Sequence, residues 1–308
     1  MELLIYLILF LLVLIVSSTT NKLLPFLPLP LVQILLGIVI GLFLPNTDFH
    51  LNTELFLALV IGPLLFRESE EADITAILKH WRIIVYLIFP VIFISTLSLG
   101  SLAHLLWLSL PLAACLAVGA ALGPTDLVAF ASLSERFSFP KRVSNILKGE
   151  GLLNDASGLV AFQVALTAWT TGAFSLGQAS SSLIFSILGG FLIGFLTAMT
   201  NRFLHTFLLS VRATDIASEL LLELSLPLVT FFLAEEVHVS GIIAVVVAGI
   251  LKASRFKKIT LLEAQVDTVT ETVWHTVNFM LNGSVFVILG MELEMIAEPI
   301  LTNPIYNP

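Results

Sequence analysis

Residues 149–162 read GEGLLNDASGLVAF, and they place two carboxylates and an amide, Glu150, Asp155 and Asn154, inside a long apolar run. Asn154 lies four residues after Glu150, so in a helix the two share a face, and Asp155 points about 100° further round. Ionisable groups at membrane depth cost on the order of 2.5–3.5 kcal/mol each, so they mark ion paths, proton relays or paired structural sites. We expect Glu150 to form half of a buried ion pair or hydrogen bond, and Asp155 to be free to bind a mobile ion.

The composition explains why these charges stand out. Of the 308 residues, 57% are hydrophobic and only 12% are charged, roughly half the charge of a soluble domain. Apolar segments that can cross a bilayer recur along the whole chain. The sequence therefore predicts an all-α polytopic membrane protein, with one integral membrane domain filling residues 1–308. Cys115 is the single cysteine, so we expect neither a disulfide nor a thiolate metal site within the chain.

Ten apolar segments are separated by polar or proline-containing loops. The predicted spans are 3–16, 27–44, 51–66, 83–102, 105–134, 143–170, 182–200, 216–234, 239–251 and 273–296.

The basic residues predict how these spans are oriented. Of the 14 lysines and arginines, all except Lys148 fall in the loops that follow odd-numbered spans. The positive-inside rule makes that side the cytoplasm and places the N-terminus outside. Lys148 lies about five residues into the sixth span, close enough to the cytoplasmic face to snorkel.

A second polar stretch, AALGPTDLVAF at 120–130, lies in the fifth span. Pro124 removes a backbone donor and Gly123 weakens the helix, so we expect the helix to kink or unwind just before Thr125. In transporters, such breaks at membrane depth coordinate small cations. The alternative is a plain proline kink capped by Thr125 and Asp126.

The depths of the two aspartates favour a shared site. Asp126 and Asp155 lie roughly 12 and 18 Å from the same membrane face, on consecutive helices that we expect to be antiparallel. We therefore expect a site made by Asp155, Asn154, Asp126 and Thr125, at which a proton and a metal cation compete for the same carboxylate oxygens.

Other polar or small residues in the spans favour structural roles. Glu219 and Glu223 are one turn apart near the start of the eighth span, and we interpret them as a solvated interfacial stripe, with Glu223 a secondary site candidate. Gly190 and Gly194 form a GxxxG pattern that indicates a helix contact. His104 and His275 are single histidines near span ends with no metal-ligand spacing around them, so we expect no metal site.

GEGLLNDASGLVAF resembles the Asn-Asp signature helix of the monovalent cation:proton antiporters, the sodium/proton exchanger family, and GPTDLVAF resembles the broken helix that precedes it. Three further segments look like the family's second, eighth-to-ninth and tenth segments, in the same order: LVQILLGIVIGLFLP, FFLAEEVHVSGIIAVVVAGIL and FVILGMELE. The resemblance covers nearly the whole chain.

The resemblance implies two inverted repeats of six helices with an extra span between them, and a core domain that moves against a dimerisation domain. It makes Asp155 the cation- and proton-binding carboxylate, Asn154 its neutral neighbour, Thr125 and Asp126 the unwound segment, and Glu150 a structural acid paired with an arginine. The Asn-Asp pair implies electroneutral exchange of one H⁺ for one Na⁺, Li⁺ or K⁺, with no cofactor. The implied protein is a homodimer in the plasma membrane.

Several features depart from the family pattern. Gly151 stands where the family has serine, and Arg67 stands where it has the glutamate of Leu-Leu-Phe-Glu, so Glu68 is only a weak candidate ligand. About ten of thirteen spans are present, and we expect the last three, with the arginine partner of Glu150, after residue 308.

Two alternatives to transport remain open at this point. One is a transport-inactive, truncated or regulatory membrane protein that keeps the front of the fold. The other is an intramembrane aspartyl protease with Asp126 and Asp155 as its dyad, although the contexts Pro-Thr-Asp and Asn-Asp differ from those of such enzymes. No nucleotide-binding motif is present, and we expect no nucleic-acid partner.

Overall fold

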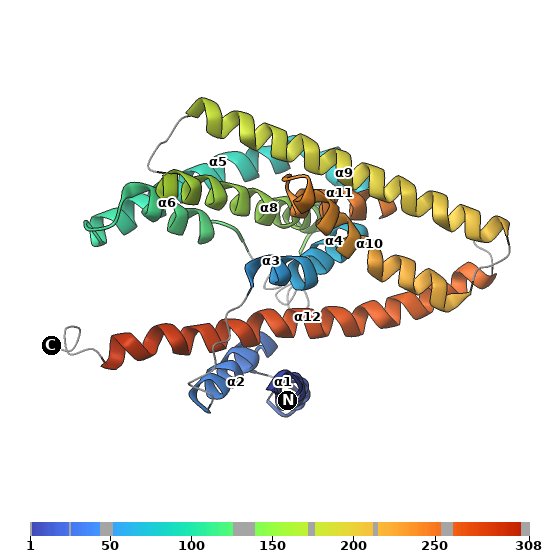
Figure 1. The fold of residues 1–308 in the computed structure, drawn as a ribbon, viewed down its shortest axis with the longest axis horizontal. Coiled ribbons are helices and arrows are strands. Elements are labelled where there is room, and N and C mark those ends of the chain that lie inside the picture. Colours follow the sequence, from blue (N-terminus) through green and yellow to red (C-terminus); the bar gives the residue numbers. More distant parts are fainter. Residues whose placement is uncertain are drawn as a thin grey trace. The chain divides into compact units, whose positions relative to one another are not determined.

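The computed structural model describes residues 2–24, 26–43, 52–125, 139–171, 176–211, 215–253 and 261–302, and all regular structure in these ranges is helical (Figure 1). The predicted all-α class is therefore confirmed. The chain divides into two compact units, residues 1–64 with 259–308, and residues 65–258.

The first unit is built from the two ends of the chain. It contains α1 (Glu2–Leu23), α2 (Leu29–Phe43), α3 (Thr53–Phe56), the π-helical turn η1 (Leu57–Ile61) and α12 (Leu261–Thr302). The backbones of α2 and α12 touch, because a Cβ atom on Gly37 would lie 3.0 Å from the Cα atom of Gly290 and one on Gly290 would lie 3.0 Å from the Cα atom of Gly37. Small residues at a crossing allow this close approach without any hydrophobic drive in lipid.

The second unit holds the remaining helices. They are α4 (Gly62–Glu71), which begins at the boundary between the units, and six others: α5 (Ile74–Leu106), α6 (Leu112–Ala121), α8 (Lys141–Thr171), α9 (Leu176–Ser210), α10 (Ile216–Glu236) and α11 (Gly241–Ala253). A ridge of isoleucines four residues apart on α5, Ile84, Ile88 and Ile92, is buried and packs against Ile146 of α8. This ridge anchors α8, the helix that carries the Asn-Asp pair.

The GxxxG pattern of α9 makes the helix contact that the sequence predicts. A Cβ atom on Gly190 would lie 2.7 Å from the carbonyl oxygen of Ser240, and one on Gly194 would overlap the carbonyl oxygen of Ala244 on α11. On the neighbouring α10, the buried hydroxyl of Thr230 donates to that of Thr197 on α9 at 3.0 Å. Helices α9, α10 and α11 thus pack through small and hydroxylated residues, as membrane helices do.

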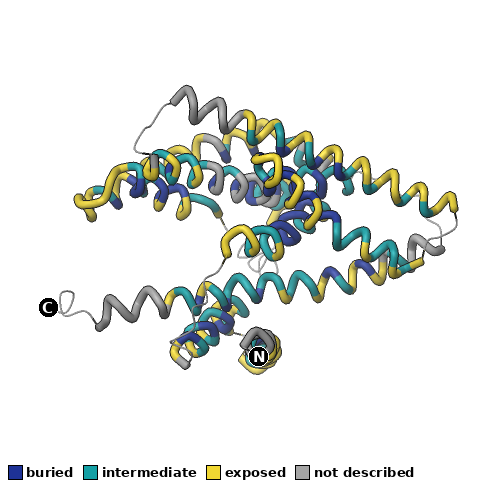
Figure 2. Tube along the Cα trace, in the orientation of Figure 1, coloured by how far each residue is buried: buried dark blue, intermediate teal, exposed yellow. Residues whose placement is uncertain are grey.

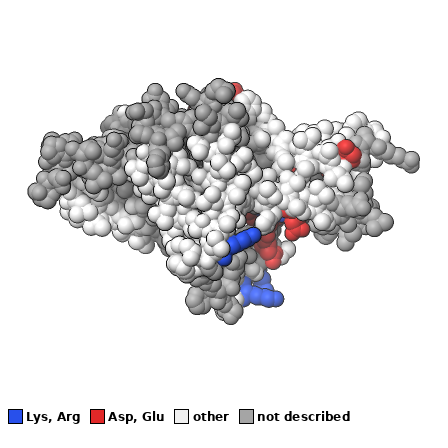
Figure 3. Space-filling view, turned by 90° about the horizontal axis from the view of Figure 1, so that it is seen from below, with Lys and Arg blue, Asp and Glu red and all other residues white. Residues whose placement is uncertain are grey.

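The surface of the described chain is apolar. Large hydrophobic side chains such as Tyr86, Phe93 and Phe203 are mostly exposed, and exposed positions recur along α9 (Figure 2). Few charged side chains appear on the face drawn in Figure 3. Four described stretches are long and apolar enough to cross a membrane: Lys79–Leu106, Phe185–Ser210, Ile216–Glu236 and Thr268–Leu293.

Each of the ten predicted segments overlaps a described helix, but the fourth and fifth are divided differently. Helix α5 continues to Leu106, and residues 107–111 form the turn before α6. Pro111 ends this turn as the N-terminal cap of α6, so the link lies a few residues later than the apolar pattern predicts. Helix α6 then ends at Ala121, well inside the predicted span 105–134, which gives the expected broken fifth helix.

Candidate functional site

The candidate site begins where α6 stops. Leu122 closes the helix with a hydrogen bond from its backbone N–H to the carbonyl oxygen of Val118 at 3.1 Å, and Gly123 and Pro124 form a bend. Proline has no N–H to continue the helical ladder, and its ring clashes with the preceding turn. Thr125 therefore follows the bend in irregular backbone, as the sequence predicts.

The hydroxyl of Thr125 joins this break to α8. It donates to Oε2 of Glu150 at 3.1 Å, with Oε1 at 3.4 Å, and it accepts from Nδ2 of Asn154 at 3.2 Å. Glu150 and Asn154 are one helical turn apart, so both side chains reach the same hydroxyl. A hydroxyl has one proton to donate and lone pairs to accept with, and Thr125 uses both functions here.

The two α8 side chains are almost completely removed from solvent. Glu150 is 7% exposed and Asn154 is fully buried. Within the described residues, Oδ1 of Asn154 accepts no hydrogen bond. Buried carbonyl oxygens nearly always have a partner, so an unpaired one is an acceptor available to a cation or to a protonated group.

Two predicted ligands, Asp126 and Asp155, complete the expected site. Asp126 lies outside the described residues, and so does the side chain of Asp155, whose backbone continues α8 directly after Asn154. The close approach of these two carboxylates stays a prediction. The sequence predicts that Glu150 forms either a buried ion pair or a hydrogen bond. The described residues show the hydrogen bond, in which Thr125 is the donor.

Arg67 of α4 pairs with nearby glutamates. Its Nη1 lies 3.0 Å from Oε2 of Glu70, and its Nε lies 2.6 Å from Oε1 of Glu71. The position at which the resemblance expects an acid therefore carries a neutralised cation. The role of Glu68, the adjacent residue, stays a prediction.

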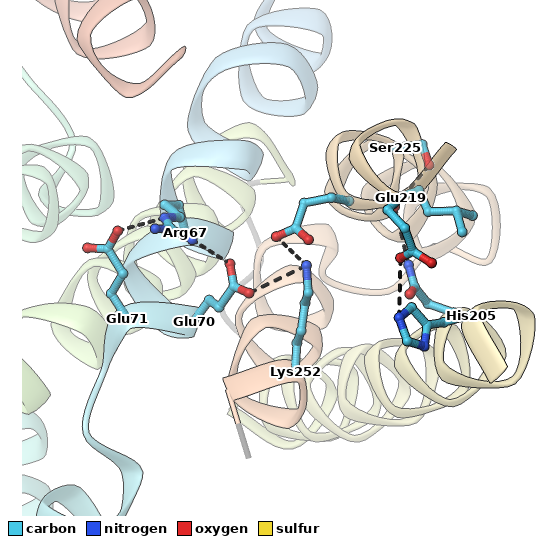
Figure 4. Close-up of polar contacts among 10 residues, drawn as sticks. Arg67, Glu70, Glu71, His205, Glu219, Ser225 and Lys252 are labelled. Atoms are coloured by element: carbon cyan, nitrogen blue, oxygen red, sulfur yellow. Dashed lines mark hydrogen bonds and ion pairs between the residues drawn. The ribbon is translucent and has the colours of Figure 1, made fainter. Parts of the chain in front are cut away.

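A charge network links α4 to α10 and α11 (Figure 4). The charge network consists of Arg67, Glu70, Glu71, Glu223 and Lys252. The Nζ atom of Lys252 pairs with Glu223 and lies 3.4 Å from Oε1 of Glu70. It also lies 5.5 Å from the ring centroid of Phe66, within cation–π range. The lysine side chain is only 8% exposed, so three helices share one buried ammonium group.

The prediction of a solvated stripe on α10 is wrong. The side chains of Glu219 and Glu223 are 12% and 15% exposed, and each has a partner. Glu219 lies 3.3 Å from Nε2 of His205 on α9, and Glu223 pairs with Lys252. One feature of the sequence could have indicated a buried partner for Glu223: the positive charge of Lys252, which directly follows the apolar run 241–251.

Comparisons with known proteins identify the family of the chain. The family model described as sodium/hydrogen exchanger, transmembrane, matches residues 7–305. The chain is similar to the sodium, potassium, lithium and rubidium/H⁺ antiporter of Bacillus subtilis, with 38% identity over 94% of this chain and 43% of that protein. It is also similar to an uncharacterized Na⁺/H⁺ exchanger of Escherichia coli, with 31% identity over 100% of this chain and 56% of the other. The chain thus spans about half the length of these relatives.

A solved structure shows the same fold. The sodium proton antiporter MjNhaP1 from Methanocaldococcus jannaschii matches with a TM-score of 0.71 at 21% identity, over 94% of this chain and 71% of that chain. The inverted-repeat antiporter fold expected from the sequence is consistent with this match. The family model also includes the α6 break, Glu150 and the Asn-Asp pair in its matched range, and on this evidence the chain belongs to the sodium/hydrogen exchanger family of transmembrane proteins.

Proposed function

We propose that the chain forms the ion-exchanging membrane domain of an antiporter that moves Na⁺ or another monovalent cation in exchange for H⁺. The observation that carries this proposal is the junction at Thr125, where a helix break meets Glu150 and Asn154 on α8. Oδ1 of Asn154 is buried and accepts no hydrogen bond from the described residues, so it adds an acceptor oxygen beside Asp155 in the chain. Irregular backbone and acceptor oxygens at membrane depth are the elements from which transporters build cation sites.

In this mechanism, Asp155 carries either a proton or a cation. Both ligands bind to carboxylate oxygens, so each displaces the other, and protons move in one direction as cations move in the other. Thr125, Asp126 and Asn154 contribute neighbouring oxygens, while Glu150 fixes the hydroxyl of Thr125. The protein exchanges the two ions by alternating access if it changes between its inward-open and outward-open states only when Asp155 carries a proton or a cation. An empty site with a charged Asp155 would not make this change.

The proposed site suits several alkali cations, because carboxylate, hydroxyl and amide oxygens are ligands for all of them. The relative from B. subtilis is named for sodium, potassium, lithium and rubidium, and we extend that range to this chain as part of the proposal. Asp155 is the carboxylate that exchanges its proton, and Asn154 beside it is neutral. We therefore propose electroneutral exchange of one H⁺ for one cation, as the family resemblance implies for an Asn-Asp pair. The chemistry needs no cofactor.

The chain is that of a multi-pass membrane protein. We further propose that the protein lies in the plasma membrane with its N-terminus outside, as the loop charges favour, and that it forms a homodimer, as the family resemblance implies. Crosslinking in intact membranes and mass measurement of the purified protein in detergent test the dimer.

Cation-driven proton movement in vesicles tests the proposal. The full-length protein is reconstituted with an internal pH-sensitive dye, and Na⁺, Li⁺, K⁺ or Rb⁺ is added outside. We expect exchange that is unchanged by a potassium–valinomycin potential, as electroneutrality requires. Asp155→Asn should abolish exchange, because an amide cannot carry the proton.

Asp215→Asn is the matched control. Asp215 is exposed and caps α10 by accepting from the backbone N–H of Ser218 at 2.9 Å, and asparagine can accept the same bond. Full exchange in Asp155→Asn would refute the assignment. Absence of exchange in the well-folded wild-type protein would instead favour the transport-inactive alternative. The protease alternative has lost its support, because the family is one of transporters.

A further inference from the structure

We propose that Gly158 is a positioning residue for the cation site. Because it presents no side chain to Pro124, the broken end of α6 can seat directly on α8. This seating holds Thr125 within hydrogen-bond reach of Glu150 and Asn154. The inference rests on the proposed function and adds a residue that touches none of the ions.

The contact between Gly158 and Pro124 leaves no room for a methyl group. A Cβ atom on Gly158 would overlap Cγ of Pro124 and would lie 3.1 Å from Cδ and 3.5 Å from Cβ. Carbon atoms make favourable contact at about 3.5–4.0 Å, so the ring would have to retreat by about 1 Å. A proline ring is closed onto its own backbone nitrogen, so it cannot move aside as a flexible side chain does.

The bend also lies against α5. A Cβ atom on Gly123 would lie 2.8 Å from Oγ of Ser95 on α5. The Ser95 hydroxyl donates to the carbonyl oxygen of Ile92 at 3.0 Å, which fixes its position. Residues 123 and 124 therefore contact both α5 and α8, and a displacement of Pro124 away from α8 also moves Thr125, the next residue in the backbone.

The hydrogen bonds of Thr125 would not survive such a push. Its contacts with Glu150 Oε2 and Asn154 Nδ2, at 3.1 and 3.2 Å, are already at the long end of the normal range. A displacement of about 1 Å breaks contacts of this length. Glu150, Asn154 and Gly158 succeed one another at intervals of four residues, so one face of α8 carries both the partners of Thr125 and the glycine that sets its distance.

The test is the apparent KM for Na⁺ in reconstituted full-length protein. We expect Gly158→Ala to raise it by at least about tenfold, since a misplacement of about 1 Å can cost up to about 100-fold. In a Pro124→Ala background, which removes the overlapping ring, the same substitution should change the apparent KM by less than about twofold. This coupling is a readout that a general loss of stability would not produce.

Gly194→Ala is the matched control. Its Cβ atom would overlap the carbonyl oxygen of Ala244, an equally tight contact between α9 and α11. We expect it to lower Tm and leave the apparent KM unchanged.

An unchanged KM in Gly158→Ala, or the same increase in both backgrounds, would overturn the inference. If Gly158→Ala fails to fold alone, folding in the Pro124→Ala background supports the contact, and failure in both overturns it. Absence of exchange in the wild-type protein would overturn the proposed function itself.

Discussion

Thr125 is the residue on which the described part of the site depends. Among the described residues, its hydroxyl is the group that connects the broken end of α6 to both Glu150 and Asn154. Without it, the carboxylate of Glu150 would keep its burial but lose its donor, and the amide of Asn154 would lose its acceptor. A buried polar group left without its partner costs about 1–3 kcal/mol, which is more than the bond itself contributes.

Thr125→Val should therefore impair both folding and exchange. Valine keeps the branched shape of threonine and removes only the hydroxyl, so we expect the free energy of unfolding to fall by about 1–3 kcal/mol and exchange to be strongly reduced. Thermal unfolding in detergent and dye-monitored exchange provide the two measurements. Thr125→Ser, which keeps the hydroxyl, should retain most of both. Equal loss in the serine and valine variants would show that the methyl group, and not the hydroxyl, is what matters.

At the scale of elements, the charge network holds three helices together by one ammonium group. Lys252 at the end of α11 lies between Glu70 of α4 and Glu223 of α10. A buried ion pair contributes little net stability compared with an apolar contact of the same shape, because desolvation offsets the attraction. Removal of one partner is different, since it leaves buried charge uncompensated.

We expect Lys252→Met to lower the free energy of unfolding by up to about 3–5 kcal/mol, because it removes the cation that Glu70 and Glu223 share, although Arg67 still pairs with Glu70. Chemical or thermal unfolding of the purified protein measures this. Lys141 at the start of α8 is exposed, so Lys141→Met should change stability by no more than about 0.5 kcal/mol. In a second comparison, Lys252→Met combined with Glu70→Gln and Glu223→Gln should recover much of the loss. No recovery in the triple variant would contradict an electrostatic origin.

The corner between α10 and α11 is closed by a histidine in a left-handed conformation. His238 has a φ of 57°, and the backbone N–H groups of His238 and Val239 donate to the carbonyl oxygens of Glu235 and Ala234 at 2.9 and 3.0 Å. This is the pairing of a Schellman motif, whose left-handed position glycine occupies most favourably.

His238→Gly should stabilise the protein, because glycine adopts φ > 0 without the steric cost that a Cβ atom brings. We expect a gain of about 0.5–1 kcal/mol, partly offset by the greater chain entropy of glycine when unfolded. The measurement is the shift in Tm, with exchange activity expected to stay the same since His238 is exposed. His238→Ala, which keeps the Cβ atom, should give no such gain, and a gain equal to that of glycine would exclude backbone strain as the cause.

At the scale of the whole molecule, the sequence predicts what depends on local chemistry. Gly123 and Pro124 together disfavour a continuous helix, and residues four apart share a face, so the α6 break and the common face of Glu150 and Asn154 were both foreseeable. A lone proline is a weaker signal, because Pro90 and Pro227 lie inside α5 and α10. The helical repeat shows which residues share a face, but it does not show which other helices pack against that face. The partners of Glu219 and Glu223 come from α9 and α11, so their burial could not be inferred from α10 alone.

Orientation in the membrane is the whole-molecule property that stays a prediction, and the chain is well suited to a test of it. Cys115 is its single cysteine and is fully buried, so Cys115→Ala gives a background without a reactive thiol. Ser109, in the turn between α5 and α6, and Lys141, at the start of α8, are both exposed. These positions belong to loops that the basic residues assign to opposite sides of the membrane.

In intact cells, a membrane-impermeant maleimide should label Ser109→Cys directly and Lys141→Cys only after permeabilisation. The expected direction follows from the cost of moving lysine and arginine across the bilayer, which retains the loops that contain them in the cytoplasm. The reverse labelling pattern would show that the protein has the opposite orientation in the membrane, with its N-terminus inside. Labelling of both positions in intact cells would mean that the segment between α5 and α8 does not cross the membrane. The similar depths assigned to Asp126 and Asp155 from one membrane face would then be wrong as well.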